Sequence, residues 1–453
     1  MTADSKKSPE IPDCYYPNNP ILITPDRPTP KESLYLSNLD DQKFLRFSIK
    51  YFYLFKKGIC VEKLKKSLSK VLTEYYPLAG RLRGSNEKLE VDCNGEGALF
   101  AEAFLETYSV DEFLEFSNKP NKSWRKLLYK VDAFSFLDVP PLVIQVTKLR
   151  CGGMILCTAI NHCLCDGIGT SQFLNDWSYL TSNPNSDLPI QPFHSRNLLK
   201  PRYPLQVTFP HSAYVKITPE MEQNDHFALD KYLQSQPLVS ISVTFNLPQI
   251  LSLKSKITPS QKCTTFEALA SHTWQAWVKS LNLSNLVKVK LLFSVNIRKR
   301  LKPELPKGYY GNGFVLGCAE TTVKDLTTNN ISHGVKLVQQ AKSTLNDDCI
   351  RSMVDFLEDK KVKTDLSTTL VISQWSKFGL EDLDFGSGKA LQMGPVVSDI
   401  YCLFLPVMNH PDSTRILISS PQNNAEKFEY YITQIDQFNG FHNEDINNTP
   451  SDS

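Results

Sequence analysis

Apolar and polar positions follow two distinct periods in the first part of the chain. Residues 45–51 alternate apolar with polar side chains, as a half-buried strand does. Apolar residues then recur at helical spacing, with lysines on the rest of the helix surface: Val61, Leu64, Leu68, Val71, Leu72 and Tyr75. The short apolar run 152–160, opened by two glycines, predicts a central strand. A second helical pattern from Ile168 to Leu180 stops at Asn183-Pro184.

The second half of the chain repeats this mixture of periods. Six prolines interrupt every period between Ser182 and Thr218, so residues 186–220 are expected to form a linker. Residues 238–245 then predict a strand. Thr264 stands three residues before Glu267, which is the spacing of a capping box at a helix start. Residues 289–298 alternate as another strand. Because strands and helices mix in both halves, an α/β fold is predicted.

Length and charge limit the organisation and the partners. A chain of 453 residues exceeds the usual size of one hydrophobic core, so two domains are expected, 1–185 and 221–442. Residues 443–453 are polar and are expected to be disordered. The 50 Lys and Arg nearly balance the 48 Asp and Glu, which gives no overall field for nucleic acid or an anionic membrane. A phosphate-bearing ligand would need a local basic patch.

The cysteines and the terminal segments indicate the cellular compartment of the protein. Eleven scattered cysteines, an odd number, do not form a disulfide framework, and reduced thiols are expected. The polar N-terminus lacks the apolar stretch of a signal peptide, and no run approaches the length of a transmembrane helix. These features predict a cytoplasmic protein without a membrane span.

The segment Asn161-His162-Cys163-Leu164-Cys165-Asp166-Gly167 carries the strongest chemical signal. It lies between the predicted strand and helix, where side chains can face a cleft. A neutral imidazole titrates near physiological pH, so His162 is a candidate general base. Without further information, a single histidine beside an apolar strand is more often a hydrogen-bonded core residue. Asp166 either orients the imidazole or supports the turn, and no second Cys or His pair supports a metal site.

Two other reaction classes lack their motifs. A serine hydrolase needs a nucleophile on a strained turn, with Gly-x-Ser-x-Gly as its usual signal, and the chain has none. The run Gly386-Ser387-Gly388-Lys389 lacks the Walker spacing and is followed by Ala390, so nucleotide hydrolysis is unsupported.

Five blocks together resemble the plant BAHD acyl-CoA-dependent acyltransferases. They are, in order along nearly the whole chain, 75–82 (Tyr-Tyr-Pro-Leu-Ala-Gly-Arg-Leu), the histidine block with Gly152-Gly153 and Trp177, 296–300 (Asn-Ile-Arg-Lys-Arg), 308–312 (Gly-Tyr-Tyr-Gly-Asn) and 384–389 (Asp-Phe-Gly-Ser-Gly-Lys). The resemblance implies two chloramphenicol-acetyltransferase-like domains with mixed sheets, a central solvent channel and a monomer. It further implies direct acyl transfer from acyl-CoA, a co-substrate, to a small alcohol, with no permanently bound cofactor.

The resemblance also assigns roles to individual residues. Asp166 would support the turn through a charge interaction, and Ser373 and Trp375 would face His162. Coenzyme A contacts would fall on Lys262, Thr264, Thr265 and Gly388, where the helix start at Thr264 offers amides and a favourable dipole to an anion. Asp384 would support the fold by pairing with Arg298.

The chain departs from the family pattern at three positions: Ser387 replaces the usual Trp, Ala390 the usual Pro and Asn296 the common Asp. Loss of the Trp removes a large packed surface from the loop on the coenzyme A side, which puts the affinity for the acyl donor in question. Two alternatives therefore stay open. One is a non-catalytic partner in very-long-chain lipid elongation, like the Eceriferum-type members, and the other is acylation of an amine. The blocks weakly favour the members that act on hydroxycinnamyl or long-chain alcohols.

Overall fold

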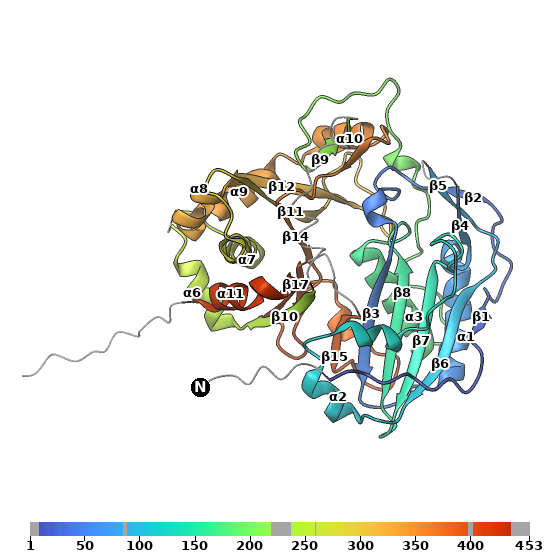
Figure 1. Ribbon diagram of the computed structural model, residues 1–453. Coiled ribbons are helices and arrows are strands. Elements are labelled where there is room, and N and C mark those ends of the chain that lie inside the picture. Colours follow the sequence, from blue (N-terminus) through green and yellow to red (C-terminus); the bar gives the residue numbers. More distant parts are fainter. Residues whose placement is uncertain (1–8, 85–87, 219–236, 259, 397–401, 436–453) are drawn as a thin grey trace, which may run out of the picture.

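The computed structural model describes residues 9–84, 88–218, 237–258, 260–396 and 402–435. It has two lobes side by side, each built on a six-stranded sheet that mixes parallel and antiparallel pairs (Figure 1). The predicted α/β class with two mixed sheets is thereby confirmed.

The N-terminal lobe contains a sheet in the order β1-β6-β7-β8-β3-β15. Only β6 and β7 run parallel. Its strands are β1 Ile21–Ile23, β3 Ser48–Phe55, β6 Ala98–Leu105, β7 Leu142–Leu149, β8 Met154–Asn161 and β15 Gln392–Pro395. The predicted central strand is β8, which is buried along its whole length between β7 and β3.

Helices cover both faces of this sheet. One face packs against α1 (Val61–Glu74) and α3 (Gly167–Ser182), and the other against α2 (Val110–Phe116) and the short η3 (Lys122–Leu127). The helix α1 buries the apolar stripe that the sequence predicts and contacts α3. A three-stranded sheet lies beside them: β2 Ser33–Tyr35, β4 Arg81–Gly84 and β5 Leu89–Asp92.

The C-terminal lobe has a second sheet in the order β10-β17-β16-β14-β11-β12, in which β14 runs parallel to both of its neighbours. Its strands are β10 Leu238–Phe245, β11 Lys288–Asn296, β12 Phe314–Thr322, β14 Thr369–Gln374, β16 Cys402–Pro406 and β17 Thr414–Pro421. The helices of this lobe are α6 Leu247–Ser255, α7 Thr265–Leu281, α8 Val323–Thr328, α9 Ile331–Ser343, α10 Asp347–Phe356 and α11 Gln422–Thr433. The predicted capping box at Thr264 starts α7.

Two segments connect the lobes. The expected linker contains only η4 (Asn197–Leu199) and β9 (Tyr214–Lys216), which pairs with β13 (Val362–Thr364). The second connection is β15, which comes from the second half of the sequence and pairs antiparallel with β3 (Figure 1). The N-terminal sheet is therefore completed by a strand from the other end of the chain.

Strand ends differ slightly from the sequence-based expectations. The strand expected at 45–51 begins at Ser48 and continues to Phe55, because residues 43–45 form the short helical turn η1 (Lys43–Leu45). The strand expected to end at Arg298 ends at Asn296. The tail 443–453 lies outside the described residues. No described helix is long and apolar enough to cross a membrane.

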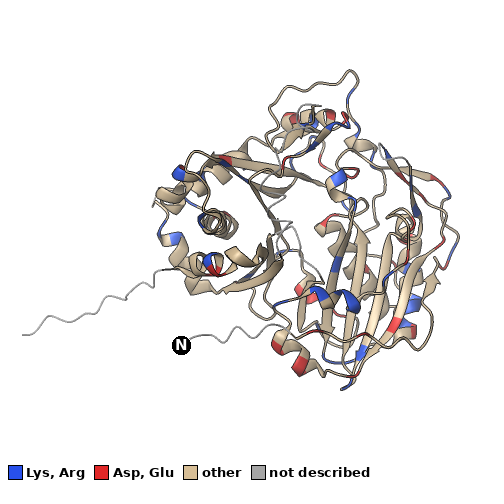
Figure 2. Cartoon of the chain, in the orientation of Figure 1, with Lys and Arg blue, Asp and Glu red and all other residues tan. Residues whose placement is uncertain are grey.

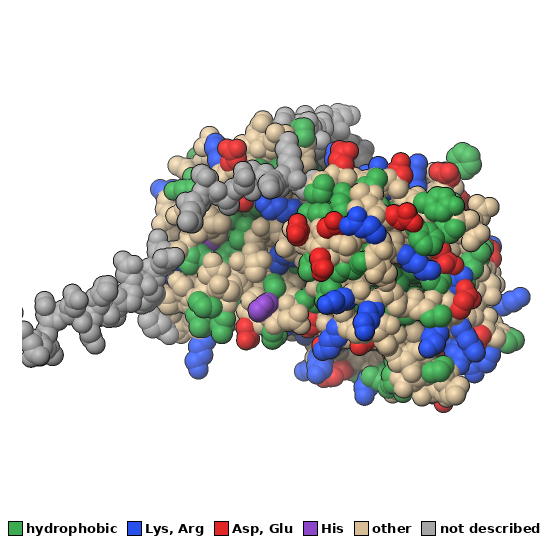
Figure 3. All heavy atoms as spheres, turned by 90° about the horizontal axis from the view of Figure 1, so that it is seen from below, with side chains coloured by type: hydrophobic (Ala, Val, Ile, Leu, Met, Phe, Trp, Pro, Cys, Tyr) green, Lys and Arg blue, Asp and Glu red, His purple; other side chains and the backbone are tan. Residues whose placement is uncertain are grey.

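Charged residues of both signs are distributed over both lobes (Figure 2). Seen from below, acidic and basic side chains are also mixed on the exposed surface (Figure 3). This mixing matches the near balance of the composition, and a basic ligand site therefore has to be local.

Candidate active site

The main chain of His162 is held on both sides. Its backbone N–H donates to the Phe47 carbonyl at 2.8 Å, which continues the pairing of β8 with β3. Its carbonyl accepts a hydrogen bond from Nδ2 of Asn312 at 2.7 Å. Asn312 is fully buried and also donates from Nδ2 and from its backbone N–H to Oδ1 of Asp40. The position of His162 is therefore fixed by two distant segments, one around residues 40–47 and one at Asn312.

The imidazole lies between two aromatic rings. Its centroid is 5.4 Å from that of Phe47 and 6.0 Å from that of Phe314. The Nδ1 atom is buried without a hydrogen-bond partner among the described residues, and the residue lines a cavity. Burial lowers the pKa of His162, and its own carbonyl together with the carboxylate of Asp166 opposes that shift. Burial therefore favours the neutral imidazole, which is the form that can accept a proton.

Asp166 does not contact the imidazole, because its carboxylate is already fully engaged. It is the N-cap of α3 and accepts from the backbone N–H of Gly169 at 2.8 Å. Both oxygens also bind the Arg298 guanidinium, at 2.8 and 2.9 Å, and Oδ2 accepts from the Gly313 N–H at 3.0 Å. The expected pairing of Arg298 with Asp384 is wrong, since Arg298 forms its ion pair with Asp166. A bidentate pair at a helix start supports the turn that carries His162.

The loop 308–313 surrounds this ion pair. The carbonyls of Tyr309, Gly311 and Gly313 accept the remaining guanidinium hydrogens of Arg298. A Cβ atom at Gly169 on α3 would come within 1.8 Å of the Tyr310 carbonyl, so only glycine allows this close approach. The family block 308–312 thus gains a physical explanation, because it packs the C-terminal lobe against the start of α3.

His162 opens into a cavity of about 190 Å³ at the junction of the two lobes. The N-terminal lobe contributes His162, Asp166 and the start of α3, and the C-terminal lobe contributes residues of β11, β12 and β14. Ser373 and Trp375, which were expected to face the histidine, line the same cavity. Asn296, one of the departures from the family pattern, lines it as well.

Trp375 holds the hydroxyl group of Ser373 in place at the cavity. The Ser373 hydroxyl oxygen accepts a hydrogen bond from Nε1 of Trp375 at 3.2 Å. The Trp375 ring stacks on Tyr51, with centroids 4.3 Å apart, and is thereby fixed on the N-terminal sheet. A serine hydroxyl that accepts one hydrogen bond still has its own hydrogen to donate, and Ser373 lines the cavity.

Sequence reasoning missed a second buried arginine behind the site. Arg196, in the linker, is 1% exposed and donates from Nη2 to the carbonyl of Leu164, inside the turn between His162 and Asp166. Its guanidinium also lies over the rings of Tyr309 and Tyr310. A single arginine in a proline-rich segment gives no periodic signal, so nothing in the sequence pattern could have identified it.

The residues expected to bind coenzyme A do not line the cavity of His162. Lys262 and Thr264 are exposed and Thr265 is half-buried, at the start of α7. The Thr264 N–H donates to the Glu267 carboxylate at 2.9 Å, so this helix start already holds an anion of the chain itself. Gly388 is exposed in a separate loop, where Asp384 accepts from the backbone N–H groups of Gly386 and Gly388. Asp384 therefore shapes this loop.

A metal site finds no support next to His162. Cys163 and Cys165 are buried, and burial raises the pKa of both thiols. In the part of the chain that the structure describes, no group of three His, Cys, Asp or Glu side chains is arranged to hold a metal ion.

Comparison with known proteins relates this geometry to enzymes. Two Arabidopsis thaliana proteins align over most of the chain: a fatty alcohol:caffeoyl-CoA acyltransferase, 36% identical over 90% of this chain and 96% of its own length, and an omega-hydroxypalmitate O-feruloyl transferase, 35% identical over 92% of each. A benzyl alcohol O-benzoyltransferase of Petunia hybrida is 32% identical over 92% of each chain.

Solved structures agree on the fold. The crystal structure of vinorine synthase superposes with a TM-score of 0.69 at 20% identity, covering 90% of this chain and 95% of that one. The Transferase family model matches residues 19–434, which includes both lobes and the His162 turn. The chain therefore belongs to this transferase family, the BAHD acyltransferases.

Proposed function

We propose that this protein transfers an acyl group from an acyl-CoA thioester to the hydroxyl of an alcohol, with His162 as general base. The observation that carries the proposal is that His162, whose pKa is lowered by burial, lines a cavity shared by both lobes. The relatives named above, which act on fatty, hydroxylated fatty-acid and benzylic alcohols, support the reaction class.

The proposed step balances without a covalent enzyme intermediate. Nε2 of His162 takes the proton of the alcohol as the hydroxyl oxygen attacks the thioester carbon. The carbonyl oxygen becomes an oxyanion, to which the hydroxyl of Ser373 donates a hydrogen bond. Collapse of the tetrahedral species breaks the carbon–sulfur bond, and the thiolate of coenzyme A recovers the proton from His162. The products are an ester and free coenzyme A.

Our assignment of the residues that bind the acyl-CoA donor rests on the family resemblance. We assign coenzyme A contacts to Lys262, Thr264, Thr265 and Gly388. The capping box occupies the amides of Thr264 and Glu267, so only Lys262 and the amides between those two residues could meet a phosphate there. A monomer acting in the cytoplasm is the accompanying expectation.

The test is a matched assay of the purified full chain. Release of coenzyme A is measured with caffeoyl-, feruloyl- and benzoyl-CoA as donors and with hexadecanol, benzyl alcohol and benzylamine as acceptors. Ester formation with an alcohol is expected, and acylation of benzylamine alone would favour the amine alternative. Calorimetry without saturable acyl-CoA binding would contradict the proposal and favour a non-catalytic role.

Replacing His162 by Ala is expected to lower kcat by roughly 10²–10⁴-fold, because it removes the positioned base. The melting temperature should stay nearly unchanged. His333→Ala on α9 is a matched control, since His333 contacts Thr321 and does not line the cavity. Activity retained within a few-fold by His162→Ala would contradict the assignment.

A further inference from the structure

A larger cavity lies beside His162, on the face of the N-terminal sheet that α2 and η3 partly cover. It has a volume of about 750 Å³. Its floor includes three neighbours in adjacent strands, Lys50 of β3, Ala159 of β8 and Val143 of β7. The segment 125–139 and the N-terminal segment 13–16 supply most of the remaining wall. The cavity is therefore built almost wholly by the N-terminal lobe.

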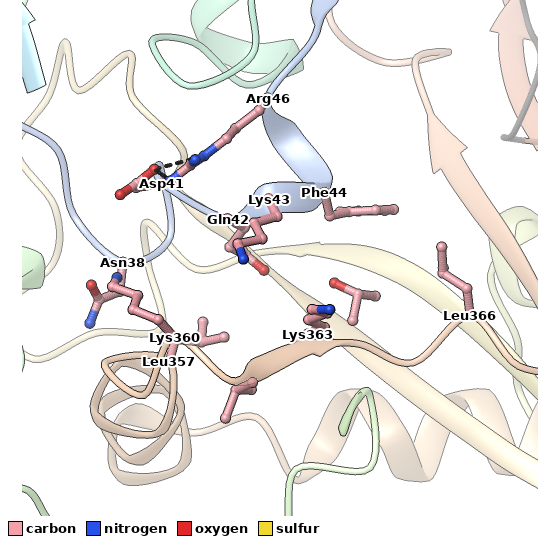
Figure 4. A pocket seen from close by; sticks show the side chains of 12 residues that line it. Asn38, Asp41, Gln42, Lys43, Phe44, Arg46, Leu357, Lys360, Lys363 and Leu366 are labelled. Atoms are coloured by element: carbon pink, nitrogen blue, oxygen red, sulfur yellow. Dashed lines mark hydrogen bonds and ion pairs between the residues drawn. The ribbon is translucent and has the colours of Figure 1, made fainter. Parts of the chain in front are cut away.

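This cavity is distinct from the one that His162 lines. Among the described residues, the two linings have no residue in common. Phe47 lines the larger cavity, and its ring centroid is 5.4 Å from that of the imidazole. Arg46 lines the larger cavity and also the neighbouring cavity drawn in Figure 4. A ligand in the larger cavity would thus lie beside the proposed base without occupying its cavity.

The inner part of the cavity is apolar. The ring of Tyr16 packs edge-on against that of Tyr129, with centroids 5.4 Å apart, and its hydroxyl donates to Oε1 of the buried Gln145 at 2.9 Å. The polar end of Tyr16 is thereby satisfied within the chain. The aliphatic and aromatic lining residues include Leu128, Val131, Phe136, Val139, Val143 and Val396. Such a surface is stabilised when a hydrocarbon chain displaces water from it.

The exposed part of the same lining is basic. Four exposed lining residues are Lys or Arg: Lys50, Arg125, Lys126 and Lys130. Arg46 is a fifth cation, and its ion pair with Asp41 is visible in Figure 4. Among the described residues, the lining has one acidic member, Asp13, whose side chain is 87% exposed and pairs with Lys126 at 3.1 Å. An ion pair this exposed contributes about 0–1 kcal/mol, so it can give way to an anionic ligand.

We propose that this cavity binds an amphiphile with one hydrocarbon chain and an anionic head, of the kind that a free fatty acid provides, at a site separate from that of acyl transfer. The chain lies on the apolar lining, and the head binds the exposed lysines and arginine by charge-assisted hydrogen bonds. A volume of about 750 Å³ is well within the range of small-molecule sites. The inference goes beyond the proposed function, because this ligand is not a substrate.

The experiment measures binding to the purified full chain by calorimetry, without turnover. The probes are dodecanoate, dodecyl phosphate and methyl dodecanoate, which has the same chain without a charge. One variant combines Lys126→Met with Lys130→Met, which removes two exposed charges and keeps their length. A second, Val139→Asp, places a carboxylate in the half-buried part of the lining. The control is Lys122→Met, an exposed residue of η3 that does not line the cavity.

Both anions are expected to bind saturably, and the tighter of the two identifies the preferred head group. The double lysine variant should raise the Kd of both anions by about ten-fold or more, as loss of charged hydrogen bonds does. Its Kd for methyl dodecanoate should stay within about two-fold. Val139→Asp should weaken all three probes, and Lys122→Met none. If Val139→Asp does not fold, the surface lysine variants decide alone.

Competition with the substrates separates this site from that of acyl transfer. Saturating coenzyme A should leave the Kd of dodecanoate within about two-fold, and displacement by coenzyme A would assign the cavity to the donor. In an assay with decanol, competitive inhibition by dodecanoate against decanol would assign the cavity to the acceptor. Either result would overturn the inference, as would equal affinity for the charged and uncharged probes. The calorimetric results do not depend on turnover, so their failure leaves the proposed acyl transfer untouched.

Discussion

His162 is positioned through its main chain, and its side chain is left free for chemistry. The backbone N–H and carbonyl are bound by Phe47 and Asn312, while the ring lies beside the rings of Phe47 and Phe314 at the distances given above. Among the described residues no carboxylate is hydrogen-bonded to the ring, which differs from a triad, where a carboxylate stabilises the imidazolium. The base therefore depends on burial to stay neutral.

The pH dependence of kcat/KM should report this burial. The neutral imidazole is the active form, and burial lowers its pKa, so activity is retained as the pH falls until it reaches that lowered pKa. The midpoint of the acidic limb is expected below the usual histidine value of about 6.5. Phe47→Ala, which admits water to the ring, should move the midpoint upward. A midpoint at or above 7 in the wild-type protein would contradict this prediction.

The start of α3 is held by several hydrogen bonds and an ion pair next to the site. Asp166 caps the helix and binds Arg298, and the loop 308–313 encloses both side chains. The helix end is therefore fixed to the other lobe as well as to its own sheet. Any loss of this ion pair leaves a guanidinium buried without its partner.

Asp166→Asn is expected to destabilise the fold by about 3–5 kcal/mol, the usual cost of breaking a buried ion pair on one side. Thermal unfolding measures the loss. Adding Arg298→Met to Asp166→Asn should recover part of it, because the unpaired charge is then gone. An unchanged melting temperature together with a clean loss of turnover would instead favour a direct role of Asp166 in orienting the base.

Local elements could be predicted from the sequence, whereas long-range pairs could not. The helix α1 follows from its stripe, and the start of α7 follows from the spacing of Thr264 and Glu267. Arg298 and Asp166 are 132 residues apart, and the family pattern paired Arg298 with Asp384 instead. The motif 384–389 forms a loop closed on itself through Asp384. Pairing across such distances is decided by packing, which a linear pattern does not contain.

At the scale of the whole molecule, the two lobes share a sheet, a cavity and a core. β15 pairs with β3, and Trp375, directly after β14 of the C-terminal sheet, stacks on Tyr51 of the N-terminal one. Gly394 in β15 lies against Phe52, with only 3.0 Å left for a Cβ atom. The site lies where these connections meet, so its geometry depends on both lobes being folded.

Thermal unfolding is therefore expected to be a single transition, with the calorimetric enthalpy equal to the van't Hoff value. Gly394→Val, which forces a side chain against Phe52, should lower the transition temperature without splitting it. Trp124 and Trp177 in one lobe and Trp274 and Trp277 in the other are buried reporters for fluorescence. Two separate transitions would show that the lobes unfold independently.

The crossing of β15 also restricts how such a chain can be recombined. A chimera joined within the linker would take β3 from one parent and β15 from the other, and their facing side chains would no longer be matched. An isolated N-terminal half would leave β3 as an exposed edge, which invites aggregation. A chimera that exchanges acceptor specificity between relatives should therefore fold only when residues 392–395 come from the same parent as the N-terminal half.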